Sequence, residues 1–216
     1  MSKKICVITG TRAEYGILFQ TLKKLKKDKS INLKLIVTGS HLEKRYGLTF
    51  REIINDKFKI DKKIKILSSS DTNLSIAKSS AKAVQKLSEA LFSLKPEIVL
   101  LVGDRYEMFS AAMACTLLRI PIAHIHGGES TEGLIDEPIR HSITKMSHLH
   151  FATTDKYCQR IIQLGENPNN VFNVGAPAIE NILQNKFINK KKLEKILKFK
   201  FKKFNILVTF HPITLE

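Results

Sequence analysis

Residues 98–128 read IVLLVGDRYEMFSAAMACTLLRIPIAHIHGG, in which two short apolar runs flank a stretch with helical spacing. The apolar runs, 98–102 and 121–125, have the length of buried strands. Parallel strands need a long crossover connection between them, and that connection is usually a helix. This stretch therefore predicts a strand, a helix and a second strand that belong to one parallel sheet.

The same alternation of apolar runs and helical patterns extends along the chain in both directions. It is typical of βα repeats, in which the crossover helices pack on the sheet. We therefore predict an α/β fold, a Rossmann-like parallel sheet with helices on both faces. The predicted strands are residues 5–9, 33–38, 64–67, 98–102, 121–125, 148–153 and 171–174.

The alternation is interrupted by a lysine-rich stretch, after which Phe204 begins a new strand-like run. We therefore divide the chain into three parts. Residues 1–185 are expected to form an N-terminal Rossmann-like domain, and 186–203 a lysine-rich helix and linker. Residues 204–216 are expected to be the first strand of a truncated C-terminal domain.

The formal net charge of +16 raises the question of nucleic-acid binding. The excess is almost all lysine, whereas base recognition favours arginine forks and stacked aromatic rings. The lysines lie in segments that are typical of solvated surface, so we expect no nucleic-acid partner. A basic surface also attracts anionic substrates such as sugar nucleotides.

Two further features concern the compartment. The apolar runs are strand-sized and fall short of the ~20 residues that a membrane span needs, so no membrane partner is expected. The three cysteines, Cys6, Cys115 and Cys158, are far apart and lack CxxC spacing. Such cysteines favour a reducing cytoplasm over a disulfide framework, and Cys6 and Cys115 are expected to be buried structural thiols.

Polar side chains follow the ends of several predicted strands, where open parallel sheets bind ligands. The loop GTRAEYG (residues 10–16) opens a helix whose first amides, together with Arg12, are suited to a phosphate. Asp104 precedes another helix, where a single aspartate is most often an N-cap. Strand alternation would place His124 and His126 on the same side of their strand. The candidate site residues from these loops are Arg12, His41, Asp104, Arg105, His126, Glu129, Asp136, Arg140 and His141.

The HxH pair with nearby carboxylates is compatible with zinc or manganese. Its spacing matches no specific ligand signature, so we predict neither a metal nor another cofactor. The same loops gather arginine beside aspartate, glutamate and histidine, which favours general acid–base catalysis and anion binding.

These residues occur in motifs that resemble those of the hydrolysing UDP-N-acetylglucosamine 2-epimerases, in the same order and over essentially the whole chain. The resemblance implies the N-terminal half of a two-domain fold of the glycosyltransferase-B type, with the substrate in the cleft between the halves. It also implies sialic-acid-like sugar biosynthesis. The motifs are GTRAEYG (10–16), TGSHL (38–42), GDRYE (103–107), HIHGGESTEG (124–133), DEPIRHSITKMSHLHF (136–151), VGAP (174–177) and FHPIT (210–214).

In such enzymes the C2 proton of the sugar is removed and UDP leaves from C1, which gives a glycal. Water then adds, and the free manno-configured sugar is released. By resemblance, Asp104 and Asp136 match catalytic carboxylates, and which of the two takes which proton stays open. The positions that match substrate-lining or supporting residues are Arg12, His41, Arg105, Arg140, His141 and His211.

The chain departs from the resemblance at His126, where many members have a catalytic glutamate. An imidazole also moves protons near neutral pH, and Glu129 is a second candidate for this role. Relatives with histidine here act on 2,4-diacetamido-2,4,6-trideoxy sugars that lead to legionaminic acid. The expected partner is therefore UDP-N-acetylglucosamine or a UDP-2,4-diacetamido-2,4,6-trideoxy sugar.

The family's chains are much longer, and the half that is missing here is expected to supply most uridine and diphosphate contacts. We therefore expect the isolated chain to be weakly active or inactive, and the full-length form to be a homo-oligomer. Two alternatives remain open. One is a non-hydrolysing 2-epimerase, which keeps UDP on its product, and the other is a sugar-nucleotide-binding half without turnover.

Overall fold

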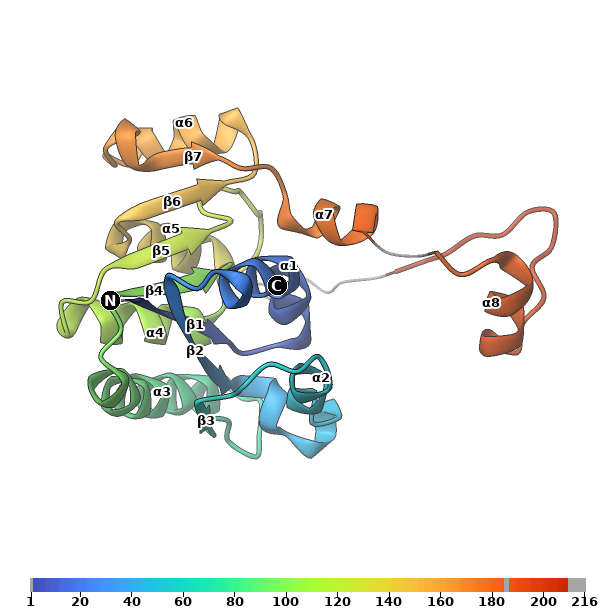
Figure 1. Cartoon of the computed structure of the whole chain (residues 1–216), viewed down its shortest axis with the longest axis horizontal. Helices are drawn as coiled ribbons and strands as arrows, with labels where there is room; N and C mark the ends of the chain where they lie inside the picture. The colour runs from blue at the N-terminus through green and yellow to red at the C-terminus, as the bar shows by residue number, and fades with distance from the viewer. Residues whose placement is uncertain (1, 185–186, 210–216) are drawn as a thin grey trace.

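A computed structural model describes residues 2–184 and 187–209 of the chain. In these ranges a single seven-stranded sheet has the order β3-β2-β1-β4-β5-β6-β7, and every neighbouring pair is parallel (Figure 1). The predicted α/β class is confirmed. The strands are β1 (Lys3–Thr9), β2 (Ile31–Thr38), β3 (Lys62–Ile64), β4 (Ile98–Val102), β5 (Ile122–Ile125), β6 (Leu149–Ala152) and β7 (Val171–Asn173).

Helices cover both faces of the sheet, as predicted. On one face α3, α4 and α5 pack side by side, and on the other α1 packs against β1 and β2 and contacts α7 (Figure 1). The helices of the described ranges are α1 (Arg12–Lys27), α2 (Phe50–Asn55), α3 (Asn73–Leu94), α4 (Tyr106–Leu117), α5 (Asp136–Met146), α6 (Asp155–Gln163), α7 (Pro177–Gln184) and α8 (Lys190–Leu197).

The core consists of two apolar clusters, one on each face of the sheet. Cys6 and Ile8 of β1 belong to the cluster under α3 and α4, whereas Val7 belongs to the cluster under α1. This alternation is the period of two that a strand buried on both faces requires. Cys6 and Cys115 lie in the first cluster, and burial raises the pKa of the Cys115 thiol to about 12. The prediction of buried structural thiols is confirmed.

The order of the strands reverses between β1 and β4. From β1 the chain goes through α1 to β2 on one side, and after β3 it returns through α3 to β4 on the other side. Such a switch point leaves a crevice at the carboxyl ends of the two central strands. The loops that open there begin at Gly10 and Gly103.

The strand β3 differs from its predicted position of residues 64–67, because it ends at Ile64. Its partner β2 ends at Thr38, whose hydroxyl donates a 2.7 Å hydrogen bond to the Ile64 carbonyl. The next residue, Gly39, has a φ of +57° and turns the chain into a short 3₁₀ helix over Gly39–Leu42. Beyond Ile64 the backbone therefore has no strand to pair with, although Ile66 is still buried.

The last described segment, residues 187–209, is largely exposed and contains α8 (Figure 1). The strand expected from residue 204 is not present in 204–209, because those residues pair with no neighbouring strand in the described ranges. The rest of that expected strand, including His211 and the FHPIT motif, lies outside the described residues. In those ranges, no helix has the length and apolar character needed to cross a membrane.

Candidate active site

Arg140, on α5, joins the two loops that carry the predicted carboxylates. Its side chain is 4% exposed, and its Nε donates a 2.9 Å hydrogen bond to Asp104 Oδ2, which its Nη2 group also contacts. Its Nη1 group donates to Glu137 Oε2 at 2.8 Å and to the Glu129 carbonyl at 3.0 Å. Asp104 is therefore an ion-pair partner of Arg140, and the N-cap position of α4 is held by Arg105 instead.

Asp136 and His141 lie on the same helix as Arg140. Asp136 is the first residue of α5, and burial raises its pKa above the usual range, with the negative charge of Asp104 adding to the rise. His141 Nε2 lies 3.1 Å from Glu137 Oε1, and its Nδ1 is buried without a hydrogen-bond partner in the described ranges. The predicted residues Asp104, Asp136, Arg140 and His141 thus form one electrostatically coupled group.

His126 lies just after the end of β5 and forms a pair with Glu129. Its Nδ1 is 2.7 Å from Glu129 Oε1, and that oxygen also accepts a 3.1 Å hydrogen bond from the Thr153 hydroxyl. The other ring nitrogen, Nε2, is buried and has no hydrogen-bond partner among the described residues. Glu129 therefore orients the ring and leaves Nε2 for a group that enters the site.

A cavity of about 350 Å³ lies at the carboxyl ends of β1, β4 and β5. It brings together four of the predicted residues, Asp104, Arg105, His126 and Glu129, although they come from two different loops. Carboxylate, imidazole and guanidinium groups around one cavity can accept a proton, donate a proton and bind an anion. The remaining lining residues are Thr11, Ala13, Glu14, Ile17, Val102 and Gly103.

The loop GTRAEYG does not present a free phosphate cradle. The amides of Gly10 and Thr11 donate to Glu14 Oε2 at 2.6 and 3.2 Å, and Thr11 and Glu14 form a capping box at the start of α1. Arg12 is mostly exposed and donates to Glu52 Oε2 at 3.0 Å. The expected phosphate site at this turn is therefore occupied by the protein's own carboxylate.

The candidate His41 and the histidine of the HxH pair that precedes His126, His124, are core residues. His41 is fully buried, with Nε2 at 3.1 Å from the Thr9 hydroxyl and Nδ1 at 2.7 Å from the Thr49 hydroxyl. His124 is also fully buried and lies 2.7 Å through Nε2 from the Gly103 carbonyl. Burial lowers the pKa of each to about 4, so both are neutral at physiological pH. The structure places His41 in the core and not on the cavity.

The prediction that His124 and His126 lie on the same side of their strand is wrong. The strand β5 ends at Ile125, and His126 has a φ of +66°, in the left-handed region. The alternation that holds along a strand does not continue through such a residue. The chain thereby points His126 at the cavity while His124 remains in the core.

Sequence reasoning missed three acidic residues at the site: Glu14, Glu107 and Glu137. Glu107 is fully buried and accepts hydrogen bonds from Arg105 Nε and Nη2 at 3.2 and 3.1 Å. A signal for Glu14 was present, because Thr11 followed three residues later by glutamate is the capping-box pattern. Glu137 also had a local signal, because its contacts with Arg140 and His141 have the i,i+3 and i,i+4 spacing of helical pairs. The contact of Glu107 with Arg105 has no comparable signature.

The close packing of two loops at Gly39 supports a testable prediction. A Cβ atom on Gly39 would lie 2.6 Å from the Gly10 carbonyl oxygen, and the backbone φ of +57° is itself unfavourable for alanine. We expect Gly39→Ala to lower the free energy of unfolding by at least about 2 kcal/mol. Gly16→Ala is the matched control, since Gly16 lies in α1 and a Cβ atom there would have no neighbour within 4 Å. The free energy of unfolding of Gly16→Ala, measured by urea denaturation, should rise by about 1 kcal/mol. Equal effects of the two changes would contradict this packing.

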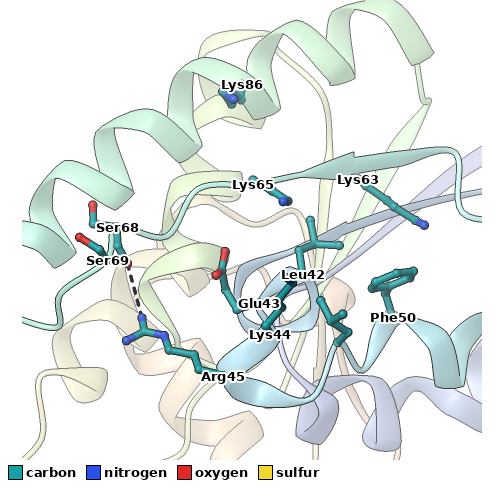
Figure 2. A pocket seen from close by; sticks show the side chains of 11 residues that line it. Leu42, Glu43, Lys44, Arg45, Phe50, Lys63, Lys65, Ser68, Ser69 and Lys86 are labelled. Carbon is teal, nitrogen blue, oxygen red and sulfur yellow. Dashed lines mark hydrogen bonds between the residues drawn. The ribbon is translucent and has the colours of Figure 1, made fainter.

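A larger, basic pocket of about 870 Å³ lies further along the same edge of the sheet, beside the ends of β2 and β3. Figure 2 shows Arg45 pointing toward Ser68 on one side of it and Lys63 beside Phe50 on the other, with Lys86 on α3 above. Arg45 Nη2 donates to the Ser68 carbonyl at 3.5 Å. Lys63 Nζ lies 3.9 Å from the centre of the Phe50 ring.

Within residues 2–184 and 187–209, no group of three or more His, Cys, Asp or Glu side chains has an arrangement that could hold a metal ion.

Two curated relatives match almost the whole chain. The GDP/UDP-N,N'-diacetylbacillosamine 2-epimerase (hydrolyzing) of Campylobacter jejuni is 48% identical over all of this chain and 56% of its own length. The UDP-N,N'-diacetylbacillosamine 2-epimerase (hydrolyzing) of Legionella pneumophila is 39% identical over all of this chain and 57% of its own length. The chain thus spans about half the length of the curated relatives it matches.

A solved structure shows the same fold. The UDP-GlcNAc 2-epimerase from Neisseria meningitidis, solved with UDP-GlcNAc bound, aligns with a TM-score of 0.74 and 23% identity over 90% of this chain and 51% of that one. In addition, residues 23–216 match the profile of the family described as UDP-N-acetylglucosamine 2-epimerase. The profile covers most of the chain, and the resemblance of its motifs is confirmed: the chain belongs to the UDP-N-acetylglucosamine 2-epimerase family.

Proposed function

We propose that this chain is the sugar-binding half of a hydrolysing UDP-sugar 2-epimerase. Its substrate is UDP-N-acetylglucosamine or a UDP-2,4-diacetamido-2,4,6-trideoxy sugar, and its products are UDP and the free manno-configured sugar. The observation that carries the proposal is the His126–Glu129 pair, whose unpartnered Nε2 lines the same cavity as Asp104. An acid–base group and a carboxylate are the equipment that removal of a weakly acidic C–H proton needs.

The reaction has two halves, and each has candidate residues here. In the first, a base takes the C2 proton while the C1–O bond breaks, so that UDP leaves and a C1=C2 double bond forms. In the second, water adds its hydroxyl to C1 and C2 receives a proton on the opposite face. The two halves need one group that accepts a proton and another that holds one. Asp104, ion-paired with Arg140, and Asp136, whose pKa is raised by burial, supply two carboxylates of unlike environment.

The relatives favour the hydrolysing reaction over its non-hydrolysing alternative. Both curated relatives described above carry "hydrolyzing" in their names, at 48% and 39% identity. Both are also named for N,N'-diacetylbacillosamine, which supports a 2,4-diacetamido sugar over N-acetylglucosamine for this chain. The legionaminic acid branch of sugar biosynthesis is therefore the pathway that we propose, ahead of sialic acid.

The test compares both sugar nucleotides in two proteins. One is the 216-residue chain, and the other, here named the extended protein, is this chain joined to the remaining C-terminal part of the Campylobacter jejuni relative. We expect the extended protein to release UDP faster from the 2,4-diacetamido substrate than from UDP-N-acetylglucosamine, and the chain alone to be weakly active or inactive. Products that retain UDP would instead support the non-hydrolysing reaction.

The division into domains is part of this proposal. The stretch that we assign to the linker and to the start of a second domain exposes many large apolar side chains. Such exposure supports a role in packing against further chain, because monomeric proteins rarely present so many apolar groups in one segment. Exposed examples are Phe187, Phe199, Phe204, Ile206, Leu207 and Val208.

We also propose that the full-length form is a cytoplasmic homo-oligomer. All three cysteines are free thiols, and a reducing compartment keeps them so. Light scattering of the extended protein tests its assembly, and a mass of one chain would contradict it.

The basic pocket beside the site predicts an electrostatic effect on substrate capture. Lys63 and Lys65 are exposed and make no ion pair in the described ranges, so their charge is available to an approaching diphosphate. We expect the double change Lys63→Gln and Lys65→Gln to weaken UDP binding by the extended protein a few-fold at low salt. In 0.5 M salt, where the screening length is about 4 Å, the affinity should hardly change. Lys27→Gln with Lys29→Gln is the matched control. An equal effect of both pairs would contradict a local role.

A further inference from the structure

Glu14 is a buried carboxyl group for which the proposed function has no role. Its side chain is only 7% exposed, although it lies in the first turn of α1 and lines the cavity. Oε2 accepts two backbone hydrogen bonds, from Gly10 at 2.6 Å and from Thr11 at 3.2 Å. Oε1 is buried and has no hydrogen-bond partner in the described part of the chain. The two oxygens of one carboxyl group are thus in unlike surroundings.

The groups around Glu14 leave its charge uncompensated. Glu107 is fully buried beside it, and Arg105 donates from Nε and Nη2 to both oxygens of Glu107. Glu14 Oε1 lies 3.9 Å from Arg105 Nε, which is beyond hydrogen-bond length. Two buried carboxyl groups therefore share one guanidinium, and it is engaged by Glu107. Two like charges in such a place cannot both be ionised without a large cost.

The other groups that face Glu14 do not supply the missing positive charge. The cavity adds Asp104, His126 and Glu129, of which His126 is already paired with Glu129. His41, which packs under the same loop, is neutral because burial lowers its pKa to about 4. Burial raises the pKa of Glu14 to about 8, and Glu107 adds to this rise against the opposing Gly10 amide and Arg105. The protonated form of Glu14 is thus favoured at neutral pH.

The geometry also fixes which oxygen holds the proton. Both backbone amides point at Oε2, so a proton there would face two donors. Oε1 has no such donor and is the free position. A neutral carboxyl in this orientation keeps the capping box intact and leaves Arg105 with a single carboxylate partner.

We propose that Glu14 carries a proton on Oε1 at neutral pH, and that loss of this proton weakens the binding of an anionic diphosphate in the cavity. Glu14 acts through Arg105 and is a positioning residue. When it ionises, it gives Arg105 a second carboxylate partner and adds a negative charge to the cavity wall. This inference rests on the proposed function, since it assumes that a diphosphate binds beside Arg105.

The test measures the affinity of UDP for the 216-residue chain and for the extended protein between pH 7 and pH 9. A phosphate monoester completes its second ionisation near pH 6, and the uracil ring loses its N3 proton only from the upper end of this range, equally in every variant. With one linked proton and a pKa of about 8 for Glu14, the affinity should fall about tenfold for each pH unit above 8. Glu14→Gln keeps an oxygen for the two amides and cannot ionise, so its affinity should change less than twofold. Glu52→Gln, on a half-exposed carboxylate near the same loop, should behave like the unchanged chain.

A second measurement reads the proton directly. In a chain labelled with ¹³C at glutamate carboxyl carbons, the resonance of Glu14 is the one that Glu14→Gln removes. It should titrate with a midpoint near pH 8, and added UDP should raise that midpoint. A Glu14 resonance that titrates near pH 4, or a UDP affinity that is independent of pH, would overturn the inference and leave the proposed function intact. Absence of UDP binding to the chain and to the extended protein at every pH would refute both the proposed function and the effect of Glu14 on binding. The titration of the Glu14 resonance would still show whether Glu14 is protonated at neutral pH.

Discussion

Asp104→Asn is expected to slow release of UDP by the extended protein by roughly 10²- to 10⁴-fold, the usual contribution of a positioned proton-transfer group. Asparagine has the shape of aspartate and can still accept a hydrogen bond from Arg140, so the loop should keep its position. The change removes a charge and a proton acceptor from the cavity and little else. The expected loss is therefore in kcat, with a smaller change in KM.

The matched control for this change is Asp28→Asn. Asp28 is exposed after the end of α1, at the opposite edge of the sheet from the cavity. Among the residues that the structure describes, its side chain bonds only to Ser30. The control should keep kcat within about twofold. A loss of less than about tenfold in Asp104→Asn would show that Asp104 does not exchange protons with the substrate.

Arg140→Ala is expected to destabilise the chain by about 3–5 kcal/mol, because it breaks a buried ion pair and leaves the other partner without compensation. Arg140 is 3% exposed and joins Asp104, Glu137, the Glu129 carbonyl and the Thr131 hydroxyl. Its removal leaves Asp104 without its ion-pair partner and takes one donor from the Glu129 carbonyl, whereas Glu137 keeps its contacts with Thr131 and His141. The urea midpoint of unfolding of the 216-residue chain measures the effect.

Two controls separate the charge of Arg140 from its shape. Arg140→Lys keeps the charge but lacks the planar fork, so its free energy of unfolding should lie between that of the unchanged chain and that of Arg140→Ala. Arg12→Ala removes an exposed pair with Glu52 and should cost at most about 1 kcal/mol. If Arg140→Ala cost no more than Arg12→Ala, the network at the cavity would not hold the loops together.

The fold could be predicted because its signal is local and repeated. The β1, β4 and β5 strands are short apolar runs between helical patterns, and a right-handed crossover between parallel strands leaves few alternatives. The same signal placed Asp104, Arg105 and His126 after strand ends, and the structure brings these three to one cavity. It failed for the end of β3, which depends on where the partner strand β2 turns away at Gly39.

The site could be predicted only in part, because several of its residues act through contacts that lie far apart in the sequence. His124 and His126 are two residues apart, but His124 is a core residue and His126 lines the cavity. The positive φ at His126 is the reason for this difference. The position of Asp104 depends on Arg140, 36 residues later. Glu14 was an exception, because its capping box with Thr11 is a local pattern. That pattern argues against a free phosphate site in this loop.

The central claim is that the cavity removes the C2 proton of a UDP-sugar and releases UDP. The most direct test is proton NMR of the extended protein with UDP-N-acetylglucosamine and with the 2,4-diacetamido substrate in deuterated buffer. We predict that the free sugar product carries deuterium at C2 and that it appears in step with released UDP, at a rate that Asp104→Asn reduces. UDP release with the C2 proton retained would mean simple hydrolysis at C1 and would contradict the account.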